Sequence, residues 1–197
     1  MARKVILCVL IAFLAIFNFP SSAMAEAVSK MTVKELIVKH SLEMGLDPAL
    51  ALSIAQKESN FKHESRSRYG AVGVFQLMPR TASKMGYNPY SLNDNIKAGI
   101  TYYKQMYKMF GSIELALAAY NAGPGNVRKY KGIPPFKETK RFVSVIMSNY
   151  NNMKTNPDPV IAQVTNSTKE ISYMETDEDF RAEHKAILES YLSNQGI

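Results

Sequence analysis

The chain has 197 residues, of which 46% are hydrophobic and 21% charged, and this composition excludes an intrinsically disordered protein. The length suffices for one hydrophobic core with a short appendage. The net charge of +7 would suit an acidic partner. However, the basic residues are scattered and form no run like those of nucleic-acid-binding arms, so we predict a solvated basic surface and no nucleic acid partner.

Residues 1–25 have the features of a secretory signal peptide. Two basic residues precede an apolar run over 5–17, and Ala23 and Ala25 fit the small-residue rule for cleavage. The run of about 13 residues is too short to span a bilayer, which needs roughly 20. The alternative is an uncleaved anchor. The chain's one cysteine, Cys8, lies here, so we expect a disulfide-free mature protein in the periplasm or outside the cell.

A helical pattern follows almost without a break, which predicts a mainly α fold. A capping box of Thr32 and Glu35 opens the first helix, and Asp47 followed by Pro48 opens the second. The pattern contains no convincing strand, although the alternating segment 72–77 could be extended. The predicted helices cover residues 32–44, 47–59, 80–85, 92–110, 112–122 and 135–153.

The amino-acid composition of the chain changes after Met153. Residues 154–170 are polar and contain two prolines, which predicts a linker. Thr176 can cap a last helix, whose apolar stripe consists of Phe180, His184, Ile187, Leu188, Tyr191 and Leu192. We therefore expect one domain over 26–154, followed by a linker and an amphipathic helix over 155–197. That helix either docks on the protein's own core or binds a partner.

Glu58 is the first candidate for chemistry, because it lies on the apolar face of its helix. On a helical wheel it falls within about 60° of Ala51, Ile54 and Ala55. Burial and the nearby helix C-terminus both raise the pKa of a carboxyl, so Glu58 could be protonated near neutral pH and act as a general acid. The alternative is a fraying helix end that turns Glu58 into solvent.

Two further segments contain polar side chains among apolar ones. In "YGAVGVFQLMP" the amide of Gln76 offers a donor and an acceptor, as a sugar-binding site would, or else completes a structural turn. In "AAYNAGPG" the hydroxyl of Tyr120 could reach a buried carboxyl, and Asn121 could bind an amide or cap the helix. The Gly-Pro-Gly run is not a phosphate loop, because no strand precedes it and no Lys-Ser/Thr follows.

As an ordered set, these segments resemble the soluble lytic transglycosylase catalytic domain, which has a goose-type lysozyme-like fold. The matching motifs are "ESNF", "GAVGVFQLMP", "NIKAGITYY", "AAYNAGPGNV" and "IPPFKETKRFV", and they fall within about residues 33–150. The resemblance implies a single helical domain with a substrate cleft. It implies a lyase that cuts the β-1,4 bond between N-acetylmuramic acid and N-acetylglucosamine in peptidoglycan and leaves a 1,6-anhydro end.

The resemblance also implies roles for particular residues. It assigns the acid/base role to Glu58 and substrate or site-support roles to Ser59, Gln76, Met78, Tyr120 and Asn121. Where the family pattern "ETxxYV" has tyrosine, this chain has Phe142, for which we expect a packing role.

The motifs supply one suitable carboxylate, whereas ordinary glycosidases use two. In the implied reaction the muramic C6 hydroxyl replaces the second carboxylate by attacking the anomeric carbon intramolecularly. No cofactor is expected, and no metal, because the three histidines lack ligand spacing. One alternative is a hydrolytic muramidase with Asp94 or Glu64 as its second acid. Another is a non-catalytic wall-binding or assembly protein.

The expected partner is the peptidoglycan glycan strand, bound by a monomer. An enzyme of this type could also open the wall locally for a secretion or conjugation apparatus, with the C-terminal helix as its tether.

Overall fold

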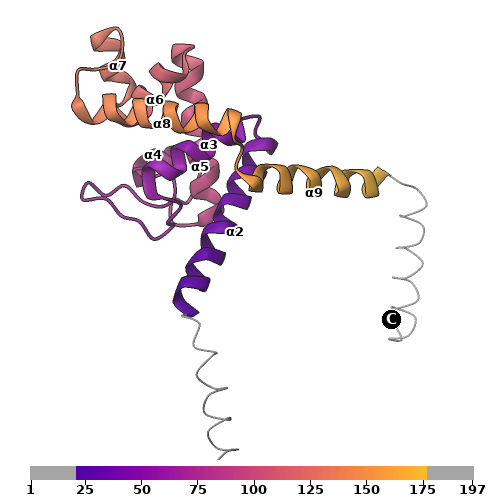
Figure 1. Cartoon of the computed structure of the whole chain (residues 1–197). Helices are drawn as coiled ribbons and strands as arrows, with labels where there is room; N and C mark the ends of the chain where they lie inside the picture. Colours follow the sequence, from indigo (N-terminus) through magenta and orange to yellow (C-terminus); the bar gives the residue numbers. More distant parts are fainter. Residues whose placement is uncertain (1–20, 177–197) are drawn as a thin grey trace, which may run out of the picture.

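A computed structural model describes the backbone of residues 21–176 and the side chains of residues 30–170. The described part is built from helices, with only isolated bridges in place of strands, which confirms the mainly α prediction (Figure 1). The helices are α2 (Ser21–Glu43), α3 (Pro48–Ser59), α4 (Pro79–Lys84), α5 (Leu92–Phe110), α6 (Ile113–Ala122), α7 (Pro124–Tyr130), α8 (Lys137–Thr155) and α9 (Pro159–Thr176).

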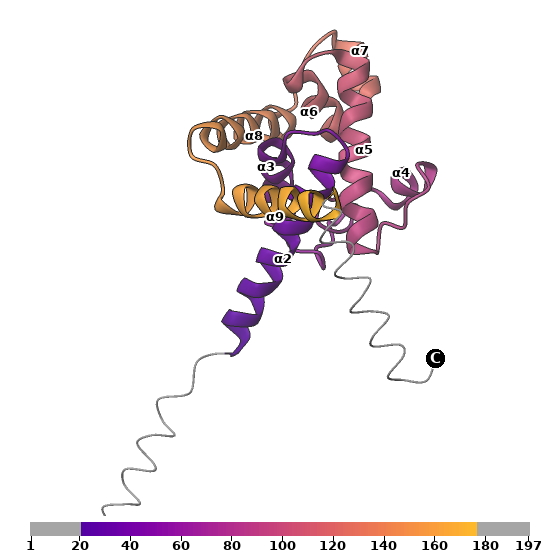
Figure 2. The ribbon, with the colours of Figure 1, turned by 90° about the vertical axis from the view of Figure 1, so that its right-hand side faces the viewer.

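The core forms around α3 and α6. Asp47 caps α3 by accepting a 2.9 Å hydrogen bond from the backbone N–H of Ala49, and residues 49–55 are all buried. α6 is apolar on nearly every side and is buried from Ala116 to Tyr120, as expected for a central helix. α8 packs on both α3 and α6, and α6 also packs on α5 and α7 (Figure 2).

The loop between α3 and α4 folds back on itself. Val72 and Leu77 exchange backbone hydrogen bonds of 2.9 and 3.1 Å, so the segment predicted as extended is a tight turn. The buried side chain of Asn95 on α5 fixes this turn. It accepts from the N–H of Phe75 at 2.9 Å and donates to the carbonyls of Val72 and Pro89, both at 3.0 Å.

The N-terminal helix is longer than the sequence predicts. α2 begins at Ser21, so the predicted capping box at Thr32 lies inside a continuous helix. No glycine or proline between these two positions interrupts the helical pattern. Residues 1–20 of the predicted signal peptide lie outside the described part, and within that part no helix is long and apolar enough to cross a membrane.

The stretch predicted as a linker is helical from Pro159. Asp158 caps α9, accepting from the N–H of Val160 at 3.2 Å, and its second oxygen bonds to Lys34 of α2 at 2.6 Å. Val160 is fully buried in the core. α9 therefore packs on α2, and the packed unit extends beyond the boundary predicted at residue 154. The predicted stripe from Phe180 to Leu192 lies outside the described residues.

Candidate active site

One cleft gathers most of the residues singled out from the sequence. It has a volume of about 380 Å³ and is enclosed by the end of α3, the loop before α4, and parts of α4, α5, α6 and α8. Its lining contains Glu58, Ser67, Tyr69, Ala71, Gln76, Leu77, Met78, Thr81, Tyr102, Tyr120, Asn121, Ala122, Gly123 and Glu138. Ser59 is the one predicted site residue outside this lining.

Glu58 occupies the last turn of α3. The helix does not fray there, because Asn60 adopts the left-handed conformation (φ 52°) and donates its N–H to the carbonyl of Gln56 at 3.0 Å. Phe61 also has a positive φ of 66°, a strained conformation for a bulky residue, and its buried ring anchors the chain reversal. The alternative of Glu58 on a frayed, solvated helix end therefore does not hold.

The surroundings of Glu58 favour its protonated form. Burial raises the pKa of Glu58 to about 8. The positive charge of Lys57 lowers this pKa and the negative charge of Glu138 raises it, but burial has the largest effect. The side chain thus retains a proton at neutral pH, as a general acid requires.

Tyr120 is held by aromatic packing and by one hydrogen bond. Its ring centroid lies 5.1 Å from that of Tyr102 and 6.4 Å from that of Phe142, to which it is nearly parallel. Its buried hydroxyl donates to the carbonyl of Phe75 at 2.8 Å, rather than to a carboxyl. Burial, and then the nearby charge of Glu58, raise the pKa of Tyr120. Tyr120 therefore fixes the loop beside Glu58.

Phe142 has the packing role expected from the sequence. It is 2% exposed, and the ammonium of Lys57 lies 5.4 Å from its ring centroid. This contact holds Lys57, a neighbour of Glu58, over an aromatic face.

Gln76 lines the cleft in a left-handed conformation (φ 45°). Its side-chain N–H₂ group donates to the carbonyls of Ser65 at 3.1 Å and Gly73 at 2.8 Å, which fixes the orientation of the amide. No donor in the described part bonds to its side-chain oxygen. That oxygen is the acceptor that a bound O–H or N–H could use.

The other predicted residues differ in position. Ser59 donates to the carbonyl of Val74 at 2.9 Å, so it ties α3 to the loop instead of facing the cleft. Met78 is 45% exposed at the start of α4 and lines the cleft. Asn121 accepts from the hydroxyl of Thr139 at 2.8 Å, which links α6 to α8.

Sequence reasoning gave no role to three residues that shape the site. Asn95 is a buried amide on an otherwise apolar helix face. A lone amide among apolar residues at helical spacing is the feature of the sequence that could have indicated its structural role. Tyr102 and Glu138 line the cleft, but they come from helices far from Glu58 in the chain. Asp94 and Glu64, the suspected second acids, are not in the lining, whereas Glu138 is. Glu138 is therefore the second carboxylate of the cleft.

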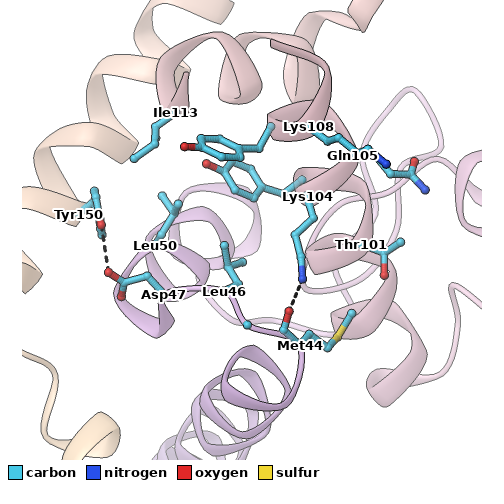
Figure 3. Close-up of a pocket in the computed structure, with 13 residues that line it drawn as sticks. Met44, Leu46, Asp47, Leu50, Thr101, Lys104, Gln105, Lys108, Ile113 and Tyr150 are labelled. Atoms are coloured by element: carbon cyan, nitrogen blue, oxygen red, sulfur yellow. Dashed lines mark hydrogen bonds between the residues drawn. The ribbon is translucent and has the colours of Figure 1, made fainter. Parts of the chain in front are cut away.

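A larger cavity of about 600 Å³ lies at the other end of α3 (Figure 3). Its carboxylate, Asp47, accepts hydrogen bonds from Tyr150 at 3.0 Å and Lys154 at 2.9 Å. Burial alone would raise the pKa of Asp47, but these bonds and the bond from Ala49 outweigh it and hold the pKa below its usual value. Asp47 is thus an ionised helix cap and cannot donate a proton at neutral pH. The cleft that contains Glu58 is therefore the candidate active site.

Nothing in the described part forms a group of three or more His, Cys, Asp and Glu side chains that could hold a metal ion. His40 bonds to Glu43 and Asn93, both at 2.9 Å, and is thereby engaged in structure.

Comparison with known proteins relates this chain to one family. The model of the transglycosylase SLT domain family matches residues 35–143. A transglycosylase of Enterobacteria phage PRD1 is 31% identical over 128 residues, which cover 64% of this chain and 46% of that protein. The soluble lytic murein transglycosylase of Escherichia coli K12 is 32% identical over 143 residues, covering 60% of this chain and 22% of that enzyme.

Solved structures of lytic transglycosylases share the fold. An inactive Glu-to-Gln mutant of Slt from Pseudomonas aeruginosa superposes with a TM-score of 0.55 at 31% identity, over 63% of this chain and 24% of that one. The 70 kDa soluble lytic transglycosylase of Escherichia coli has a TM-score of 0.55 at 28% identity, over 64% of this chain and 25% of that one. The chain thus spans less than half the length of these relatives.

Proposed function

This chain belongs to the transglycosylase SLT domain family, and from that premise we propose that it is a peptidoglycan lytic transglycosylase. It cleaves the β-1,4 bond between N-acetylmuramic acid and N-acetylglucosamine and leaves a 1,6-anhydro end. The observation that carries the proposal is a single glutamate, Glu58, held in a cleft with its pKa raised to about 8. The Pseudomonas aeruginosa relative is inactive when one of its glutamates is replaced by glutamine.

The proposed reaction uses Glu58 twice. Its protonated carboxyl first donates a proton to the glycosidic oxygen, and the bond from that oxygen to the muramic anomeric carbon breaks. The resulting carboxylate then removes the proton of the muramic C6 hydroxyl while that oxygen bonds to the same carbon. Glu58 ends the cycle protonated, and no water is consumed. The attack is intramolecular, so it needs no second carboxylate as nucleophile.

The remaining cleft residues position the glycan strand. Gln76 offers its side-chain oxygen to a hydroxyl or acetamide N–H, and Asn121 offers its amide. Met78 supplies an apolar contact on the cleft wall. Tyr120 and Ser59 support the loop that carries Gln76, because both donate to its backbone carbonyls.

One observation favours a second candidate, hydrolysis of the same bond. Glu138 is a second carboxylate in the cleft lining and could activate a water molecule. The raised pKa of Glu58 favours either enzyme over a non-catalytic wall-binding protein, because a binding protein has no use for a buried acid.

The proposal places the enzyme at the wall as an exported monomer. The features of residues 1–25 support export to the periplasm or beyond. Local opening of the wall for a secretion or conjugation apparatus is the proposed physiological role.

The direct test of the site is Glu58→Gln, which keeps the shape of the side chain but cannot donate the proton. We expect lysis of purified peptidoglycan to fall by at least about a hundredfold, the usual contribution of general acid catalysis. The helical circular dichroism spectrum should be unchanged. The matched control is Glu64→Gln in the exposed loop, which should retain full activity. A folded Glu58→Gln protein with near-normal lysis would exclude Glu58 as the acid.

A further inference from the structure

A groove separate from the candidate active site runs between α2 and α9. It has a volume of about 720 Å³ and shares no residue with the Glu58 cleft. The residues on each side follow helical spacing, so one face of each helix lines it. The α2 face contributes Thr32, Glu35, Leu36, Lys39, Leu42 and Glu43, and the α9 face contributes Gln163, Val164, Ser167 and Thr168. Leu42 is 39% exposed and offers apolar surface at the edge of the groove.

Among residues 159–170, whose side chains the structure describes, α9 is packed only at its beginning. Val160 is buried, Ile161 and Val164 are partly buried, and every side chain from Asn166 to Glu170 is exposed. Figure 1 shows α9 leaving the body of the molecule after its contact with α2. Most of a helix's stability in a protein comes from tertiary packing, so the exposed stretch from Asn166 to Glu170 would be stabilised by a covering element.

The chain itself supplies a segment of suitable length and pattern. It leaves α9 at Thr176, and the 21 residues from 177 to 197 follow. Their apolar residues recur at helical spacing from Phe180 to Leu192. A reversal over residues 177–179 is within the usual loop length of an antiparallel helix pair.

We propose that residues 177–197 fold back as a helix antiparallel to α9 and dock in the groove between α2 and α9. Both helices rise about 1.5 Å per residue, so a turn at 177–179 places Ile187 opposite Thr168 and Tyr191 opposite Val164. The most apolar part of the stripe then lies over the α9 face of the groove, beside Leu42. The docked helix covers the second half of α9 and completes a helical hairpin across α2.

The test measures whether the groove is covered in the full chain. Cys8, the chain's one cysteine, is replaced by serine, and one new cysteine is placed in the groove (Thr168→Cys) or on the opposite face of α9 (Lys169→Cys). Both positions are exposed in the described part of the structure. We expect a small maleimide to react with the Thr168→Cys thiol at least about tenfold more slowly, because labelling must wait for the segment to leave.

A second pair of variants identifies the covering segment. Ile187→Asp, which puts a charge in the stripe, should raise the labelling rate of Thr168→Cys to that of Lys169→Cys. Ser190→Asp adds the same charge away from the stripe and should leave the slow rate unchanged. Equal rates at both cysteines in the parent chain would overturn the proposal and leave the groove open to a partner protein. Slow labelling that depends on protein concentration, or that survives Ile187→Asp, would also overturn it.

Discussion

Glu58 is maintained in a state that costs stability. A carboxyl moved from water into a protein interior loses hydration of its charged form, so it stays neutral at pH values where an exposed glutamate ionises. The backbone strain at Phe61 is next to it, where the chain turns sharply after α3 ends at the cleft. Two unfavourable features, a buried carboxyl and a strained backbone turn, therefore occur at the same helix end.

The cost of burying Glu58 can be measured by unfolding the Glu58→Gln variant. The pKa of Glu58 is raised from 4.5 to about 8 on folding, so the folded state binds more protons than the unfolded state between these values. The stability of the parent protein should consequently fall as pH rises through this window. A neutral glutamine should abolish that loss, worth up to roughly 3 kcal/mol at pH 7, since one pKa unit corresponds to about 1.4 kcal/mol.

The measurement is urea unfolding of the parent, Glu58→Gln and Glu64→Gln at several pH values. The stability gained by Glu58→Gln over the parent should be smallest near pH 4 and grow towards pH 8. The Glu64→Gln control should follow the parent. A gain that does not change with pH would show that the folded state does not raise the pKa of Glu58.

Glu138 contributes to the raised pKa of Glu58 through its negative charge. Activity should decline with rising pH as Glu58 loses its proton, with a midpoint near its pKa of about 8. Glu138→Gln should move this midpoint to lower pH while leaving activity at pH 6 largely unchanged. Loss of activity at every pH would instead indicate that Glu138 takes part in the chemistry, as in the hydrolytic candidate.

The sequence could predict the burial of Glu58, because a helical wheel places it beside Ala51, Ile54 and Ala55. It could not predict the partners of Tyr120 and Ser59. Both hydroxyls donate to loop carbonyls, and a backbone acceptor has no sequence signature. Local sequence patterns do not predict such long-range contacts, and Tyr120 and Phe75 are 45 residues apart in the chain.

At the scale of elements, the loop over residues 70–77 depends on close packing against α5. A Cβ atom added at Gly99 would lie 2.2 Å from the ring of Phe75, and one added at Gly73 would lie 2.3 Å from the amide of Asn95. Gly73 also has a positive φ of 80°. These two glycines let the loop approach α5 and thereby bring Gln76 into the cleft.

Gly99→Ala tests this packing. In a helix interior alanine is normally favoured over glycine by about 1 kcal/mol. Here the ring of Phe75 is buried and cannot move aside, so we expect a net destabilisation of roughly 1–3 kcal/mol and reduced wall lysis. Gly125→Ala in α7, whose Cβ would meet no atom within 4 Å, is the matched control and should be neutral or stabilising. Thermal unfolding of both variants distinguishes the outcomes, and a stabilised, fully active Gly99→Ala protein would contradict the proposed loop packing.

The two Asp-Pro pairs show where sequence reasoning succeeded and failed on elements. Asp47 with Pro48 and Asp158 with Pro159 cap their helices in the same way, each by bonding the N–H two residues on. The first was recognised because an apolar run follows it. The second lies in residues 154–170, whose polar composition and two prolines predict a linker. Tertiary contact of Val160 with the core, which composition does not reveal, stabilises the beginning of α9.

At the scale of the whole molecule, five helices (α3, α4, α5, α6 and α8) and the loop before α4 bring the cleft together. Glu58 comes from α3, Tyr102 from α5, Tyr120 and Asn121 from α6, and Glu138 from α8. The ordered motifs predicted the family, and the helical pattern of the chain predicted the mainly α fold. They could not predict the distances across the cleft, which depend on how the helices cross.

The product of wall cleavage tests the central claim most directly. Purified peptidoglycan is digested with the full-length protein, and the released fragments are weighed by mass spectrometry, with Glu58→Gln as the inactive control. Intramolecular attack by the muramic C6 hydroxyl predicts 1,6-anhydro ends, each lighter by one water than a hydrolytic end. Fragments that carry only reducing muramic ends would contradict a lytic transglycosylase and indicate hydrolysis with Glu138 as the second acid.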